Sequence, residues 1–501
     1  MKAPASLAAI LLLSLSSVAC GSAPAPKAEA LPQPKPSAAP AALPPDPEPW
    51  RNERPPAGAA SELHFPQPEQ AKLSNGLSLM LVRKPLPVAS LSLVFRHGAA
   101  ACPTGKSGLA ALTARMLTEG TKKHPSLALS EEIEQLGTTL DEDAGRDSSS
   151  LSLSALTADL DRALELLGEV VTEPGFLPAD FERVQQEWLD GLRAERQAPE
   201  RLASLVALGT LLGSPHGSPV SGSLADVQKL TIKDIAEFHR KAYLAGDATL
   251  IVVGDVDLAK LQKSAERAFK KLSRGQSRLE QPFTAPAAPQ AKQILLVDKP
   301  GAVQSALALA QPQPKRGDPG FEQRELLTTL FGGLFTSRLN LNLREEHAYT
   351  YGARAQNVAT AHWGALYIAT SVRSDVTADA LKEALKELNL LRDAKLGKPL
   401  SAAEVGRARA DLVQSVGARL EYSARIGSSL ADLWLHSLPL DYYARYPGLL
   451  ATETPDSLSR LATSLEVDRQ VVVVVGDRKL VEAPLKALGY SVVPAPQQLI
   501  E

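Results

Sequence analysis

The sequence predicts an α+β fold built from two homologous lobes, each a largely antiparallel sheet with helices packed on it. Three observations predict this fold. Strand-like and helix-like segments are mixed along the chain after an opening turn, which is typical of helices layered on one face of a sheet. The second half of the chain repeats the first. With 501 residues, of which 44% are hydrophobic and 22% charged, the chain is long enough for two domains with packed cores.

The spacing of apolar residues places the elements of the first half. Asn75-Gly76 predicts a tight turn before the first strand. Further strands are expected at 88–95, 148–156 and 248–255. Helices are expected to begin at 109 and to cover 130–136, 157–171, 179–195, 201–212 and 232–243.

Three short matches relate the second half to the first. They have the same order in both halves, at offsets of 215, 220 and 222 residues: 81–88 with 296–303, 157–159 with 377–379, and 253–255 with 475–477. Slowly growing offsets of this size indicate one ancestral domain that was duplicated. We therefore expect a first domain at 66–272, a polar, proline-bearing linker at 273–290 and a second domain at 291–499.

Charge and cysteine content exclude several classes of protein. With 54 basic and 56 acidic residues, the formal net charge is -2, which does not favour nucleic acid or an anionic membrane surface. Cys102 is the only cysteine besides Cys20. The folded part is therefore expected to have no internal disulfide, and Cys102 is expected to be buried and without a catalytic role.

The first 65 residues are expected to be an export signal and a tether. Lys2, a short apolar run at 7–15 and small residues before Cys20 predict a signal peptide at 1–20, since the run is too short to span a bilayer. Residues 21–65 are rich in proline and alanine, which predicts a disordered spacer. The residues around Cys20 resemble a bacterial lipobox. That resemblance implies a lipoprotein of the outer membrane that faces the periplasm, and a soluble exported protein remains the alternative.

Residues 105–121 form a glycine-bounded turn and helix that resembles a zinc-binding helix. It resembles the one that carries the inverted motif His-x-x-Glu-His in the pitrilysin, insulinase and mitochondrial processing peptidase superfamily. In this chain Ala111 and Arg115 occupy the two histidine positions, and Ala114 occupies the position of the catalytic acid. The resemblance covers nearly all of 66–498 and implies the two-lobed clamshell of that superfamily.

A metal is not expected in this chain. A zinc helix needs two histidines at i and i+4, whereas the two nearest of the eight histidines are fifteen residues apart. Glu187, 76 residues after Ala111, resembles the third zinc ligand of active members. Its alternative is an exposed helical glutamate. We hypothesise that Arg115 forms an ion pair with Glu187 where a metal would have been.

Residues 337–352 resemble the segment in which superfamily members keep an arginine and, seven residues later, a tyrosine. Here these are Arg344 and Tyr351, and Ala348 replaces the usual glycine. In active relatives the pair contacts the substrate backbone and the transition-state oxyanion, a role that suits two hydrogen-bond donors. The alternatives are a helix C-terminal cation for Arg344 and a half-buried strand aromatic for Tyr351.

These features predict a non-catalytic subunit of a two-chain bacterial zinc endopeptidase, which is inactive alone. A homologous partner would bring the zinc, and this chain would bring Arg344 and Tyr351 to a peptide substrate. A second hypothesis is a lipid-tethered peptide-binding or scaffold protein without an enzymatic partner. A third, a peptidase that is active alone, requires a bound metal.

Overall fold

The computed structural model describes residues 48–53, 64–279, 282–287 and 289–500. The chain separates into two compact units, 1–61 and 62–501. The described part of the first unit contains the 3-10 turn η1 (Pro49–Asn52). The predicted signal peptide, Cys20 and most of the predicted tether lie outside the described residues. Within the described residues, no helix has both the length and the apolar character needed to cross a membrane.

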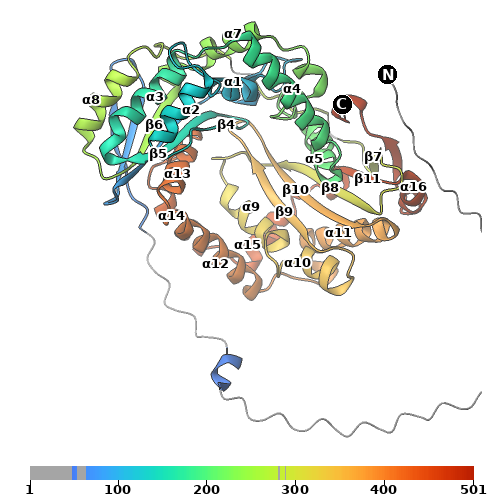
Figure 1. The fold of residues 1–501 in the computed structure, drawn as a ribbon. Coiled ribbons are helices and arrows are strands. Elements are labelled where there is room, and N and C mark those ends of the chain that lie inside the picture. The colour runs from blue at the N-terminus through green and yellow to red at the C-terminus, as the bar shows by residue number, and fades with distance from the viewer. Residues whose placement is uncertain (1–47, 54–63, 280–281, 288, 501) are drawn as a thin grey trace, which may run out of the picture. The chain divides into compact units, whose positions relative to one another are not determined.

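The second unit contains two six-stranded sheets that share five strands of the same order and direction (Figure 1). They differ in the sixth strand, at one edge: β1 runs antiparallel to β2, whereas β12 runs parallel to β7. Their strand orders are β1-β2-β6-β3-β5-β4 and β12-β7-β11-β8-β10-β9. The first comprises β1 (Glu69–Lys72), β2 (Ser78–Arg83), β3 (Val88–Phe95), β4 (Asp141–Ala144), β5 (Ser149–Leu156) and β6 (Ala248–Gly254). The second comprises β7 (Gln293–Asp298), β8 (Gln304–Gln313), β9 (Ala353–Ala359), β10 (Gly364–Arg373), β11 (Val471–Gly476) and β12 (Ser491–Pro494). Most neighbouring strands run antiparallel, which confirms the predicted fold class.

The matched segments of the two halves occupy the same places in the two sheets. The first match lies on β2 in the first half and on β7 in the second, and the last match lies on β6 and on β11. Strand β2 pairs in parallel with β6, and β7 pairs in parallel with β11. The middle match follows β5 in the first half and β10 in the second, at the start of a long helix. The internal repeat predicted from three short matches is therefore present in the fold.

Helices surround both sheets. The first half contains α1 (Leu109–Leu117), α2 (Ser126–Gln135), α3 (Leu160–Thr172), α4 (Pro178–Glu195), α5 (Pro199–Leu212), α6 (Leu224–Val227), α7 (Ile232–Ala242) and α8 (Leu258–Ala268). The second half contains α9 (Phe321–Thr328), α10 (Arg338–Asn340), α11 (Thr377–Arg392), α12 (Ala402–Ala418), α13 (Ser423–Leu435), α14 (Tyr442–Ala451), α15 (Pro455–Ala462), α16 (Arg478–Ala487) and α17 (Gln497–Ile500). Two π-helical turns, η5 (Thr329–Gly333) and η6 (Leu341–Glu346), follow α9 and α10.

One helix of each half packs on the sheet of the other half. Helix α5 packs on β8 and β11, and helix α13 packs on β3 and β6 (Figure 1). The α5 side chain Val206 lies in one buried cluster with Val473 of β11, and the α13 side chain Leu430 lies in one with Ile251 of β6. Both faces of each sheet are therefore covered, which the expectation of helices over one face did not include.

Candidate functional site

Helix α1, which carries the three positions predicted to correspond to the zinc motif, begins at a glycine that its surroundings require. Gly108 has a φ of 87°, and a Cβ there would lie 2.8 Å from the carbonyl oxygen of Ser221. Ala111 and Ala114 are buried, whereas the side chain of Arg115 is about one third exposed, at 32%. Only Arg115 among these three therefore offers a polar group on this face of the helix.

Arg115 and Glu187 take part in one chain of ion pairs but do not contact each other directly. Arg115 pairs with Glu119, one turn further along the chain, at 2.6 Å. Arg183 contacts the second oxygen of Glu119 and lies 3.0 Å from Glu187. The hypothesis of an ion pair between Arg115 and Glu187 is therefore wrong. Each residue has a partner of opposite charge at i+4 or i−4, where helix geometry makes neighbours of side chains.

A second carboxylate lies near Arg115 from the edge strand β4. Glu142 is 3.8 Å from the Nε atom of Arg115. Burial raises the pKa of Glu142, and the nearby charge of Arg115 opposes that rise only in part. The cluster around Arg115 thus combines three carboxylates with two guanidinium groups, those of Arg115 and Arg183.

This arrangement does not fit zinc. The two histidine positions hold Ala111 and Arg115, so α1 offers no imidazole. Among the described residues, no group of three histidine, cysteine, aspartate or glutamate side chains is placed to hold a metal ion. The carboxylate of Glu187 is 57% exposed and is bound to Arg183. Zinc sites use histidine, cysteine and carboxylate ligands converging on one point, which this cluster lacks.

Sequence reasoning missed Glu119 and Arg183, which link Arg115 to Glu187. A signal for them was present, because Arg115 and Glu119, and likewise Arg183 and Glu187, are four residues apart on predicted helices. The contact between Arg183 and Glu119 joins α4 to the end of α1 and depends on tertiary packing, so spacing alone could not show it.

In the second half, Arg338 anchors the segment that carries Arg344 and Tyr351. Arg338 is buried and donates hydrogen bonds to both carboxylate oxygens of Glu404, at 2.7 and 3.1 Å. It also donates to the carbonyl oxygens of Lys398 and Pro399. Burial opposes ionisation of Glu404, but hydrogen bonds from Arg338 and Ser401 lower the pKa of Glu404 to about 2.

Arg344 and Tyr351 flank the turn by which the chain passes from η6 to β9. Arg344 is in the last turn of η6, as the helix C-terminal alternative expects. Tyr351 precedes β9 and is 91% exposed, which does not match a half-buried strand aromatic. Between them Ala348 has a φ of 53°, in the left-handed region that glycine tolerates best, so a glycine would adopt this conformation with less strain.

Two buried contacts fix the backbone around this connection. The amide of Asn340 donates to the carbonyl oxygen of Phe335 at 2.7 Å and accepts from the N–H of Ala353 at 3.1 Å. Gly332 lies so close to β9 that a Cβ would be 2.5 Å from the Cβ of Ala355. Gly332 therefore has a packing role against β9.

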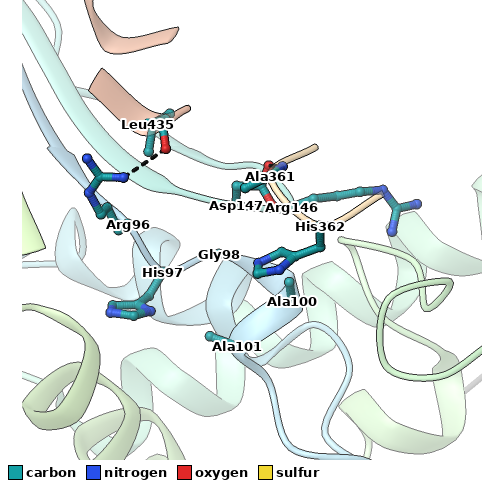
Figure 2. A pocket seen from close by; sticks show the side chains of 10 residues that line it. All are labelled: Arg96, His97, Gly98, Ala100, Ala101, Arg146, Asp147, Ala361, His362 and Leu435. Atoms are coloured by element: carbon teal, nitrogen blue, oxygen red, sulfur yellow. Dashed lines mark hydrogen bonds between the residues drawn. The ribbon is translucent and has the colours of Figure 1, made fainter. Parts of the chain in front are cut away.

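A pocket lies where the hairpin turns of the two repeats meet (Figure 2). The turn between β4 and β5 supplies Asp147, whose carboxylate accepts from the N–H of Ala361 at 2.8 Å in the turn between β9 and β10. Arg96, at the end of β3, donates to the carbonyl oxygen of Leu435 at the end of α13, at 2.8 Å. These bonds join the two repeats, and neither involves the α1 cluster or the Arg344 segment.

Comparisons with known proteins agree with this geometry. The pattern of the insulinase family, peptidase family M16, matches residues 79–215, and that of the peptidase M16 inactive domain matches residues 229–412. The chain belongs to peptidase family M16. The sequence of this M16 member contains no His-x-x-Glu-His motif.

Several M16 relatives resemble most of the chain. A non-peptidase homologue named YmxG from Helicobacter pylori is 24% identical over 362 residues, which is 71% of this chain and 81% of that protein. A zinc protease named PqqE from the same species is 22% identical over 386 residues, 75% and 85% of the two chains. A crystal structure of a peptidase M16 inactive domain from Pseudomonas fluorescens has a TM-score of 0.75 and 27% identity, covering 82% of this chain and 98% of the other.

Proposed function

We propose that this M16 chain is the non-catalytic subunit of a two-chain zinc endopeptidase. The observation that carries the proposal is an asymmetry between the two repeats. Around α1, the charged groups at the former metal position bind one another. In the second repeat, Arg344 and Tyr351 lie at the surface, where they are accessible to a substrate and to a second chain.

The chemistry of the two exposed side chains supports this role. Hydrolysis of a peptide bond places negative charge on the former carbonyl oxygen, and donors aimed at that oxygen stabilise the transition state. A guanidinium and a phenol hydroxyl are both such donors. The zinc that activates water would belong to the partner, because the residues around α1 do not fit a metal.

Relatives offer further support. Both a protein named as a non-peptidase homologue and one named as a zinc protease resemble this chain, and both come from Helicobacter pylori. The coexistence of these two kinds of M16 chain in one species is what a paired enzyme requires. By analogy, the proposed partner is a zinc-bearing M16 homologue from the same organism as this chain.

The site of action belongs to the same proposal. Lipidation of Cys20 and a proline-rich tether would hold the folded part at the periplasmic face of the outer membrane. A soluble exported form would follow if an ordinary signal peptidase cleaves instead. Labelling the expressed protein with a radioactive fatty acid, with Cys20→Ser as the control, separates the two, since only the lipoprotein takes up a label that the variant loses.

Co-expression with a zinc-bearing homologue tests the proposed function. We expect the two chains to purify together and to cleave an unstructured peptide that neither chain cleaves alone. Arg344→Ala should leave the complex intact and lower kcat/KM by about 100-fold, the scale of losing one oxyanion donor. Peptide binding by this chain alone, with no zinc-bearing chain retained, would favour the tethered scaffold instead.

A further inference from the structure

We propose that Phe335 is a positioning residue for Arg344. This inference rests on the proposed function. The ring of Phe335 lies 4.5 Å from the central guanidinium carbon of Arg344, with that carbon over the ring. Phe335 is 60% exposed, although burial is the favoured state of a phenylalanine ring. Exposed apolar side chains are common on protein surfaces, so the contact of this ring with the guanidinium of Arg344 is the observation that carries the proposal.

The cation–π contact orients the arginine without using its hydrogen-bond donors. Within the described residues, the charged partner of Arg344 is Glu345, which lies 3.3 Å from Nε, and both side chains are more than one third exposed. An exposed ion pair of this kind holds a side chain only weakly. A ring face attracts the cation through its quadrupole while the N–H groups stay in the plane of the guanidinium. Arg344 can therefore be held in place and still bind a carbonyl oxygen.

The backbone places Phe335 in a fixed position relative to the rest of the site. Asn340, which is 4% exposed, holds the carbonyl of Phe335 and the N–H of Ala353, two residues after Tyr351. One buried amide thus ties the loop that carries Phe335 to the segment that carries Tyr351. The backbone that carries the Phe335 ring and the backbone next to Tyr351 are consequently held together by one buried side chain.

A matched control exists in the same repeat. The guanidinium carbon of Arg425 lies over the ring of Tyr422 at 5.1 Å, and Tyr422 is 59% exposed. This is a second exposed pair of an arginine and an aromatic ring, outside the segment 335–353. Tyr422→Leu therefore removes a similar contact without touching the proposed site.

The test measures peptide cleavage by the complex of this chain with a zinc-bearing homologue. Phe335→Leu should lower kcat/KM by about three- to tenfold, the scale of a partly exposed cation–π contact, and Phe335→Trp should retain the wild-type rate. Tyr422→Leu should have no effect. In an Arg344→Ala background, Phe335→Leu should cause no further loss, because the ring acts through the arginine.

Each other outcome has a distinct meaning. Equal losses for the leucine and tryptophan variants, or a full further loss in the Arg344→Ala background, would overturn the positioning role. A rate that falls with Arg344→Ala but is unchanged by Phe335→Leu overturns this inference and leaves the proposed function intact. If the wild-type complex does not cleave, or if Arg344→Ala has no effect, the proposed function fails and this inference fails with it.

Discussion

The clusters around Arg115 and Arg344 use the same kind of side chain in opposite ways. In the first repeat, Arg115 and Arg183 both contact Glu119, whose side chain is only 5% exposed. In the second repeat, the ion pair that Arg344 forms among the described residues is a partly exposed one with Glu345, and Tyr351, seven residues later, lies almost fully in solvent. The first repeat therefore satisfies the charges of this cluster internally, and the proposed function assigns ligand binding to the partly exposed donors of the second repeat.

Arg338 shows that the second repeat also contains arginines of the structural kind. Its guanidinium is buried and binds Glu404 and two backbone carbonyls, only six residues before Arg344. The two arginines of this segment therefore differ in role. Arg338 fixes the segment, whereas Arg344 remains accessible to solvent. Position in a motif does not decide between these roles, but burial and the number of satisfied donors do.

The shared acid of the first cluster, Glu119, should contribute strongly to stability. Glu119→Gln removes the charge that two arginines contact, and we expect a loss of about 2 kcal/mol in the free energy of unfolding, measured by urea denaturation. Glu187→Gln, at the exposed end of the same chain of ion pairs, is the control and should change stability by less than about 0.5 kcal/mol. Equal effects of the two substitutions would contradict the account of a cluster centred on Glu119.

Acid should weaken the two repeats in different pH ranges. Burial lowers the pKa of His239, in α7 of the first repeat, from 6.5 to about 4. His239 therefore becomes protonated at a lower pH in the folded state than in the unfolded state. The free energy of unfolding should fall as the pH drops from about 6.5 to 4 and then level off. The total loss from this group is about 3 kcal/mol. The measurement is the free energy of unfolding as a function of pH across this range. In the His239→Gln variant, this pH dependence should disappear.

Glu404 in the second repeat responds at lower pH. Its pKa is lowered in the folded state, so its contribution is complete above about 4.5 and is lost as the pH falls towards 2. Glu404→Gln should remove the pH dependence in this lower window while leaving the window of His239 unchanged. If Glu404→Gln instead changed the pH dependence of unfolding between about pH 6.5 and 4, the two pH ranges would have been assigned to the wrong groups.

The smallest expected effect is on the exposed pair itself. Arg344→Ala and Tyr351→Phe should each change the free energy of unfolding by less than about 1 kcal/mol, because Tyr351 is almost fully exposed and the contacts of Arg344 with Glu345 and Phe335 are partly exposed. Thermal unfolding of the isolated chain is the measurement. A large loss of stability would mean that the pair is part of the scaffold, and the contrast with Arg115 would disappear.

Much of the fold could be predicted because its signals are local. The strand at 88–95 was placed correctly, and three short matches were enough to show the repeat. Strand β4 was missed because Asp141-Glu142-Asp143-Ala144 has no apolar alternation, as is common in an edge strand. The exchange of α5 and α13 was also missed, since it depends on contacts between distant parts of the chain. The even distribution of buried apolar residues around α5 was a usable signal for it.

The candidate site was predictable only in its residue types. The positions of Arg344 and Tyr351 came from a resemblance, and their exposure could not be deduced from spacing. The expected partner of Arg115 was wrong because helix neighbours at i+4 compete with residues on other helices. Phe335 escaped notice because an aromatic residue in a loop has no periodic pattern, and its contact with Arg344 is visible only in three dimensions.

The central claim is that the active groups of this chain lie in the second repeat and that the former metal position is inert. The most direct measurement compares Tyr351→Phe with Glu187→Gln in the purified two-chain complex. We predict that Tyr351→Phe lowers kcat by about 100-fold while Glu187→Gln leaves kcat unchanged. A large loss with Glu187→Gln, or an unchanged rate with Tyr351→Phe, would contradict the account.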